Sequence, residues 1–209
     1  MKAIPSETSI REFLAAVASA DGLHGAVSAA AVSGGLGISL LAMVAAFPKT
    51  RSDSVADRTA LIKAATALSD LQEQLIETIE TETAVKIFAA RNMPQASAAQ
   101  RTERQAAIQL ALRAAADVPL EVMRLCARGL KLAESVAAHG ARAASGDVQL
   151  GVALLHAAFG GARANLEGKL SSLADAPSMT AVVHEIAHLS EDAMAAMREV
   201  ESVLRVPPA

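Results

Sequence analysis

Apolar residues recur along this chain at the spacing of three and four residues that places them on one face of an α-helix. The first such segment follows Ser9, and Glu12 stands three residues later, which is the pattern of a capping box. The periodicity continues through most of the sequence. It predicts further helices over about residues 28–47, 54–80 (with a kinked continuation to 91 as an alternative), 98–116, 119–139, 148–173 and from the break at 175–178 to 204.

Proline, glycine and short polar residues mark the breaks between these helices. Residues 92–97 and 140–146 have the composition of loops. Pro119 is expected in the first turn of a helix, because the N–H that proline lacks has no helical partner there. We therefore expect one helix to end near Ala116 and another to begin at Pro119.

No segment shows the alternating pattern of a β-strand, and the composition agrees with this. The chain is 52% hydrophobic but only 2% aromatic, with four Phe and no Tyr or Trp. β-Sheets favour aromatic and β-branched residues, whereas alanine is the strongest helix former. The predicted fold is all-α: an orthogonal or up-down bundle of about six to eight helices that forms a single domain over residues 1–209.

The stretch from Gly22 to Pro48 contains no charged side chain if His24 is neutral. It is longer than the ~20 residues that span a bilayer. However, it consists largely of Ala, Gly and Ser, acidic residues precede it, and no second apolar stretch follows. We expect the central Ala/Gly-rich helix of a bundle or oligomer, and no membrane contact.

Charge and cysteine content narrow the function classes. A net charge of −3 and the scarcity of aromatic residues give no basis for nucleic-acid binding. The single cysteine, Cys126, cannot form an internal disulfide and lies in an apolar pattern, so it is expected to be a small buried residue. Without a disulfide framework, a cytoplasmic location is expected.

Residues 184–188 have the sequence His-Glu-Ile-Ala-His. On a helix, His184 and His188 share one face and can bind zinc, while Glu185 polarises a bound water. Zinc sites need a further ligand, and only a short charged helix follows. A zinc hydrolase stays open as an alternative, although two partly exposed imidazoles explain the motif as well, and no metal site is expected.

Five segments carry a resemblance to a known family. The helix at 28–47 (SAAAVSGGLGISLLAMVAAF) has the family's pattern of Ser, Gly, Leu and Met positions. The other four follow in order: KIFAARNMP at 86–94, AAIQLALRAAADVPL at 106–120, Gly146-Asp147 before a helix, and GARAN at 161–165. Over about residues 9–175 the chain resembles the formimidoyltetrahydrofolate cyclodeaminase / methenyltetrahydrofolate cyclohydrolase family.

The resemblance implies an all-α homodimer that binds a tetrahydrofolate derivative as substrate and needs no further cofactor. The implied catalytic carboxylates are Asp147 and Glu80. The implied substrate-binding residues are His24, Gly25, Ser28, Lys49, Asn165 and Arg163. Asn165 would orient water or the pterin, and Ser28 would bind a polar group at a helix N-terminus. The family's second asparagine is replaced by Lys169.

The implied reaction is hydrolysis of 5,10-methenyltetrahydrofolate to 10-formyltetrahydrofolate, or cyclisation of 5-formiminotetrahydrofolate with release of ammonia. A non-catalytic or ligand-shifted relative that keeps the dimeric bundle is an alternative. The glycine-rich turn of the family is altered in this chain, where Gly22 to Ser28 reads GLHGAVS.

Overall fold

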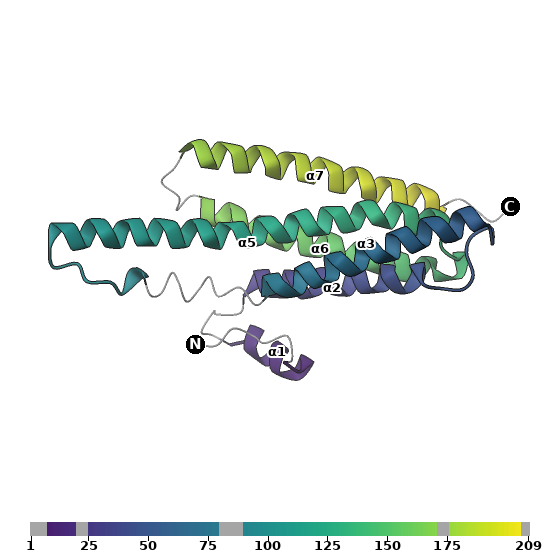
Figure 1. The fold of residues 1–209 in the computed structure, drawn as a ribbon, viewed down its shortest axis with the longest axis horizontal. Helices are drawn as coiled ribbons and strands as arrows, with labels where there is room; N and C mark the ends of the chain where they lie inside the picture. The colour runs from purple at the N-terminus through teal and green to yellow at the C-terminus, as the bar shows by residue number, and fades with distance from the viewer. Residues whose placement is uncertain (1–7, 20–24, 80–89, 171–175, 206–209) are drawn as a thin grey trace.

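The computed structural model describes residues 8–19, 25–79, 90–170 and 176–205. Its helices are α1 (Ile10–Val17), α2 (Ala26–Ala45), α3 (Val55–Ile79), α5 (Ala98–His139), the 3₁₀ helix η1 (Arg142–Ala144), α6 (Ser145–Leu170) and α7 (Ala176–Arg205). Apart from one isolated bridge between Thr50 and Gly140, these residues contain no β-structure. The all-α prediction is confirmed, and the long helices run side by side along the bundle (Figure 1).

Helix α2 lies against α3, α5 and α6 and runs antiparallel to α6. Glycines allow the close approach of α2 and α6. A Cβ added at Gly37 would lie only 2.7 Å from the carbonyl oxygen of Gly151, and one added at Gly151 would lie 3.0 Å from that of Gly37. The Gly residues of α2 and α6 therefore allow the two helix backbones to pack in direct contact, because glycine has no Cβ.

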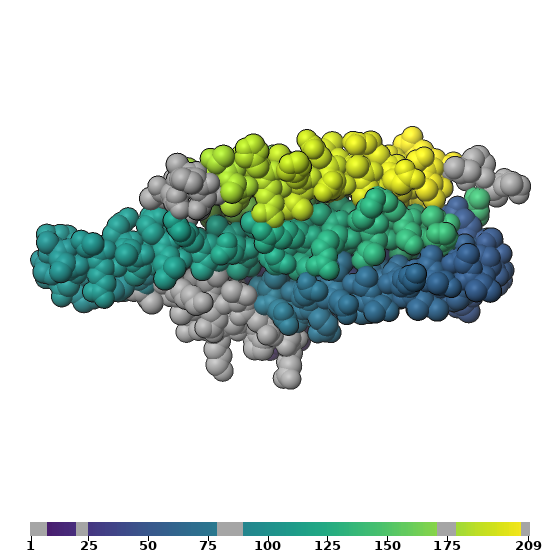
Figure 2. Space-filling model, turned by 45° about the horizontal axis from the view of Figure 1, so that its top comes forward, coloured from purple at the N-terminus to yellow at the C-terminus, as the bar shows by residue number. Residues whose placement is uncertain are grey.

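Helix α5 corrects the prediction of two helices separated near Pro119. It is one continuous helix of 42 residues with Pro119 in its interior. Proline removes the hydrogen bond to the carbonyl four residues earlier, which is that of Ala115. The Nζ of Lys169 donates to this oxygen at 3.0 Å, so the helix continues without an unsatisfied carbonyl. The N-terminal part of α5 projects beyond the rest of the bundle (Figure 2).

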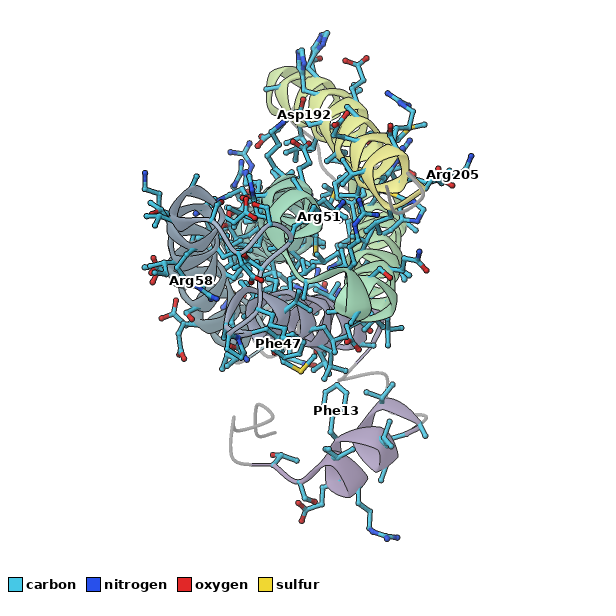
Figure 3. The ribbon with its side chains drawn as sticks, turned by 90° about the vertical axis from the view of Figure 1, so that its right-hand side faces the viewer. Phe13, Phe47, Arg51, Arg58, Asp192 and Arg205 are labelled. Carbon is cyan, nitrogen blue, oxygen red and sulfur yellow. The ribbon has the colours of Figure 1, made fainter. Side chains whose placement is uncertain are left out.

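Helix α1 begins with the predicted capping box: the backbone N–H of Glu12 donates to Ser9 Oγ at 3.3 Å, and Ser9 N–H donates to the Glu12 carboxylate at 3.0 Å. None of its residues is buried, and Ile10 is 80% exposed. Viewed along the bundle, α1 stands apart on the side of α2 (Figure 3).

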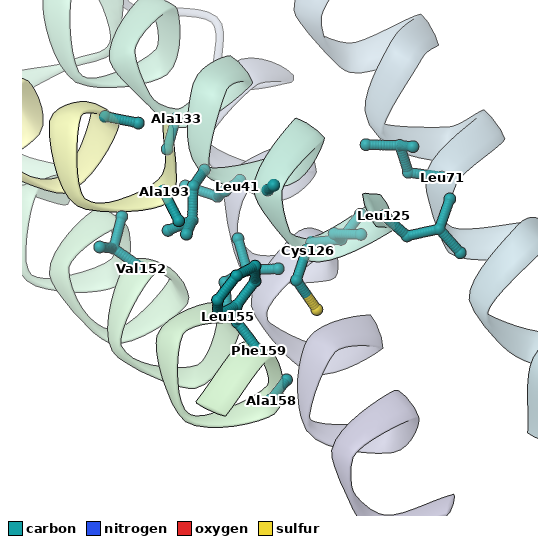
Figure 4. Close-up of a cluster of buried hydrophobic side chains, with 14 of the residues drawn as sticks. Leu41, Leu71, Leu125, Cys126, Ala133, Val152, Leu155, Ala158, Phe159 and Ala193 are labelled. Atoms are coloured by element: carbon teal, nitrogen blue, oxygen red, sulfur yellow. The ribbon is translucent and has the colours of Figure 1, made fainter. Parts of the chain in front are cut away.

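The core is built from leucines, alanines and valines of α2, α3, α5, α6 and α7 (Figure 4). Cys126 lies within it, fully buried, which confirms the prediction for this residue. Burial raises the pKa of its thiol to about 12, because the thiolate would have to form in an apolar environment.

By length and composition alone, helix α2 could cross a membrane. Within the bundle, 39% of its most apolar 18-residue stretch is buried. Its inner face, which includes Ile38 and Leu41, is fully buried. On the opposite face Leu36 is 55% exposed and Met43 is 41% exposed. The helix is thus buried on one side and apolar on both.

Candidate functional site

The N-terminus of α2 carries two of the predicted substrate-binding residues. Gly25 is the N-cap in extended conformation, and no side chain caps this end. Ser28 lies in the first turn and is half-buried. The free N–H groups and the positive end of the helix dipole make this terminus suited to a polar or anionic group. His24 falls outside the described residues.

Asn165 lies at the same end of the bundle. A Cβ added at Gly161 of α6 would lie 3.8 Å from the Cβ of Ala30 on α2. Because the two helices are antiparallel, Asn165, one turn after Gly161, is level with Ala26, one turn before Ala30. The structure therefore brings Gly25, Ser28 and Asn165 to one end of the bundle.

The carboxamide oxygen of Asn165 is buried and has no hydrogen-bond partner within the described part of the chain. A buried acceptor without a donor costs free energy, and most native structures avoid it. A bound water or ligand N–H would remove this cost. Among the predicted substrate-binding residues, Asn165 therefore has a buried acceptor that a ligand could satisfy.

Two basic residues close to Asn165 on α6 have protein partners. The Arg163 side chain donates to Glu167 at 2.7 Å and to Ser190 Oγ of α7 at 3.3 Å. Lys169, where the family has a second asparagine, donates to the Ala115 carbonyl. Burial lowers the pKa of Lys169. Arg163 thus ties α6 to α7, and Lys169 ties α6 to α5.

The predicted catalytic residue Asp147 and the predicted substrate-binding residue Lys49 lie at the other end of the bundle. Asp147 is in the first turn of α6, and Lys49 is exposed in the segment after α2. Eighteen residues of one straight helix separate Asp147 from Asn165, which corresponds to about 27 Å. These two side chains do not meet within one chain. Glu80, the other predicted carboxylate, lies outside the described residues.

Beside Lys49 the structure contains a polar cluster that the sequence reasoning missed. Asp57, buried in the first turn of α3, accepts from Ser52 Oγ at 2.6 Å and Ser52 N–H at 2.8 Å. Its other oxygen lies 2.9 Å from His139 Nδ1 at the end of α5. Hydrogen bonds from Ser52 and then His139 hold the pKa of Asp57 well below its usual range. The Ser54-x-x-Asp57 spacing, a helix-start pattern, was the available signal.

This cluster joins three chain segments. Arg51 donates through its backbone N–H to the His139 carbonyl at 2.8 Å and through Nη2 to the Ala137 carbonyl at 2.7 Å. An acidic residue in the first turn of α3, where the dipole of that helix favours a negative charge, thus meets the last turn of α5. His139, in the last turn of α5, has Asp57 as its partner.

The His-Glu-Ile-Ala-His motif lies on α7. Glu185 is held by Arg124 of α5 through two hydrogen bonds, of 2.6 and 2.9 Å. His184 and His188 are exposed. Among the described residues, no three His, Cys, Asp or Glu side chains converge in a way that would hold a metal ion. The glutamate of the motif serves helix packing and is not directed at a site between the two imidazoles.

Comparison with known proteins extends this description. Residues 9–188 match the formiminotransferase-cyclodeaminase family. A methenyltetrahydrofolate cyclohydrolase of Methylorubrum extorquens is 32% identical over 153 residues, which are 72% of this chain and 73% of the relative. The crystal structure of formiminotetrahydrofolate cyclodeaminase from Thermotoga maritima has the same fold, with a TM-score of 0.84 over 95% of this chain and 96% of that one, at 21% identity. The resemblance seen in the sequence is confirmed: this chain belongs to the formiminotransferase-cyclodeaminase family.

Proposed function

We propose that this protein is a folate one-carbon enzyme that hydrolyses 5,10-methenyltetrahydrofolate to 10-formyltetrahydrofolate or cyclises 5-formiminotetrahydrofolate with release of ammonia. The observation that carries the proposal is the 32% identity to a methenyltetrahydrofolate cyclohydrolase over most of both chains. The hydrolysis is the first candidate, since that relative is named for it.

The proposed hydrolysis makes modest chemical demands. The methenyl carbon is part of a cationic amidinium, so water adds to it directly. A base takes one proton from this water as the C–O bond forms. The hydroxyl proton of the adduct then moves to N5 while the C–N5 bond breaks and the formyl group is left on N10. The enzyme must position the water, accept the proton and stabilise the adduct, and no cofactor is required.

Asn165 and the start of α2 are the residues best suited to hold the substrate. The unpartnered Asn165 oxygen accepts a hydrogen bond from the attacking water or from a pterin N–H. The N–H groups near Gly25 and Ser28 donate to a carbonyl or carboxylate of the folate. Asp147 is the proposed base and, because it lies about 27 Å from Asn165 of its own chain, it would act on substrate held by a second copy. Lys49 is available to the glutamate tail. With no Tyr or Trp in the chain, backbone, amide and aliphatic groups would contact the pterin.

We further propose a homodimer that works in the cytoplasm without membrane or nucleic-acid contact. The packing of α2 against three helices supports a soluble bundle, and the apolar outer side of α2 supports a second copy of the chain as its partner. The other reaction, in which N10 adds to the formimino carbon and ammonia leaves, would make the enzyme a lyase.

The test follows the absorbance of methenyltetrahydrofolate with and without the protein. Acceleration over buffer is expected, and it should be lost in Asn165→Leu, which keeps the side-chain volume but removes the acceptor. Ammonia release from formiminotetrahydrofolate, measured in parallel, separates the two reactions. If the wild-type chain accelerates neither reaction, the proposed function is wrong.

A further inference from the structure

Lys169 lies next to the residues proposed to hold the substrate. It follows Asn165 by one helical turn on the same face of α6, a spacing that places the two Cβ atoms about 5–6 Å apart. Since α6 is antiparallel to α2 and Asn165 is level with Ala26, Lys169 lies beyond the first residue of α2. The start of α2 and the end of α6 share one end of the bundle (Figure 1). The uncapped N–H groups of α2 therefore point toward the region beside Lys169.

Contacts of α6 with two other helices show the direction in which Asn165 faces. Gly161, one turn before Asn165, faces Ala30 of α2. Lys169, one turn after it, reaches the Ala115 carbonyl of α5. Residues four apart on a helix differ in direction by about 40°, so Asn165 faces the space between α2 and α5. The buried, unpartnered oxygen of Asn165 and the Nζ of Lys169 therefore border the same space.

The Nζ of Lys169 has one hydrogen-bond partner among the described residues, the carbonyl oxygen of Ala115 at 3.0 Å. A neutral amine has two N–H groups and one lone pair, so this bond leaves one N–H and the lone pair for a ligand. The Ala115 carbonyl thus positions Nζ without removing its capacity to take up and release a proton.

The surroundings of Lys169 favour its neutral form. Burial lowers its pKa. Titratable side chains on the neighbouring turns of α5, α6 and α7 are all exposed: Arg113, Asp117, Arg163, Glu167 and His184. The first turn of α2 carries no acidic residue. A methenyl folate bound here would bring a cationic amidinium, which disfavours an adjacent ammonium further.

The second half of the proposed hydrolysis needs a proton carrier. In the adduct, the hydroxyl group and N5 are bonded to the same carbon. Direct transfer of the hydroxyl proton to N5 would close a four-membered ring, with an O–H···N angle far below the ~120° at which hydrogen bonds weaken steeply. A single amine nitrogen can contact the hydroxyl group and N5 together and avoids this strained geometry.

We propose that Lys169 carries this proton: its amine takes the hydroxyl proton as the C=O bond forms and gives another proton to N5 as the C–N5 bond breaks. The O–H electron pair becomes the second C–O bond, the C–N5 pair becomes the N5–H bond, and Lys169 ends neutral. This inference rests on the proposed function and adds a catalytic residue to it. Asn165 and Asp147 keep their proposed roles.

Lys169→Arg and Lys169→Gln test the inference, because both keep an N–H donor for the Ala115 carbonyl but neither exchanges a proton at neutral pH. Urea unfolding establishes that each variant is folded. The kcat for methenyltetrahydrofolate should fall at least about 100-fold with little change in KM. Lys63→Arg, on the exposed side of α3, is the control and should keep full activity. A smaller loss in either folded variant overturns the inference, while the proposed function stands.

The pH profile gives a readout that a purely structural role of Lys169 would not change. The neutral amine is required, and burial lowers the pKa of Lys169 below its usual 10.5. Wild-type kcat, corrected for the rate in buffer at each pH, should therefore rise with pH through that lowered pKa. The rise should be absent in Lys169→Arg, whose guanidinium stays protonated. The same rise in both chains would overturn the inference.

Acetylation of the wild-type protein tests the contact with folate apart from catalysis. The probe is 5-formyltetrahydrofolate, which the proposed hydrolysis neither consumes nor forms. At millimolar concentration it should protect Lys169 from acetic anhydride, as measured by peptide mass spectrometry, and leave the labelling of Lys63 unchanged. Equal labelling of Lys169 with and without this folate overturns the inference. If the wild-type chain converts neither folate substrate, the proposed function is wrong and the inference fails with it.

Discussion

The Lys169 ammonium donates a 3.0 Å hydrogen bond to the carbonyl oxygen of Ala115, the oxygen that the interior Pro119 deprives of its helical donor. A side chain of α6 thus replaces a backbone hydrogen bond of α5. Burial lowers the pKa of Lys169, which is the consequence of holding an ammonium between two packed helices. A proline in a helix interior otherwise costs about 3 kcal/mol or more.

Substitution of Lys169 by Met should destabilise the protein by about 1–2 kcal/mol, because the Ala115 carbonyl is left without a donor. In a Pro119→Ala background, the new backbone N–H supplies that donor, so the same substitution should cost much less. Urea unfolding of the four chains measures this coupling in a double-mutant cycle, which also cancels the effect of proline on the unfolded chain. Equal costs in both backgrounds would contradict the role assigned to Lys169.

Asp57→Asn should lower the urea midpoint at pH 7 and do so less at acidic pH. The pKa of Asp57 is lowered in the folded state from its usual 3.8, by Ser52 and then by His139, so the folded state favours the carboxylate. The stabilisation is therefore fully present above about pH 4 and is lost as pH falls through the lower folded pKa. Unfolding from pH 7 to pH 2.5 checks this, with Asp70→Asn on the exposed side of α3 as the control. If the stability of Asp57→Asn changes with pH in the same way as that of the wild type, the stabilising role of the Asp57 carboxylate is wrong.

Helical periodicity predicted the fold class and most helix positions. The capping box at Ser9 and Glu12 is local chemistry and was read directly from the sequence. The unbroken α5 was not predictable in this way, because its continuity through Pro119 depends on Lys169, a residue fifty positions later. Local rules describe what proline does to an isolated helix, whereas here the compensating donor comes from tertiary packing.

The candidate site was predicted as a set of residues without its geometry. Motifs placed Ser28 and Asn165 together, and the antiparallel register of α2 and α6 agrees. The same motifs grouped Asp147 with them, although helix rise alone puts it at the opposite end of α6. Asp57 was overlooked since its partner His139 is distant in sequence, and only the fold joins the start of α3 to the end of α5.

Gly151→Ala should destabilise the bundle by about 1–3 kcal/mol, because the new methyl group would lie 3.0 Å from the Gly37 carbonyl oxygen and 3.2 Å from Leu41 Cγ. Gly160 of the same helix is the matched control. A Cβ there meets nothing within 4 Å among the described residues, so Gly160→Ala should stabilise the protein by about 0.5–1 kcal/mol through helix propensity. If the α2–α6 contact is as close as described, the melting temperature should fall in Gly151→Ala and rise in Gly160→Ala. A change in the same direction in both variants would contradict the close contact.

Glu185→Gln and His184→Ala should leave the proposed hydrolase activity within about two-fold of wild type, and dialysis against a chelator should not reduce it. Glu185 is engaged by Arg124 across the α5–α7 contact, with both side chains more than a third exposed, so its loss should cost no more than about 1 kcal/mol. A zinc hydrolase built on this motif requires the opposite: stoichiometric zinc by elemental analysis, lost together with activity in His184→Ala. Because the Arg124 contact occupies the carboxylate that such a mechanism needs as its base, the expected result is a change in stability without a change in catalysis.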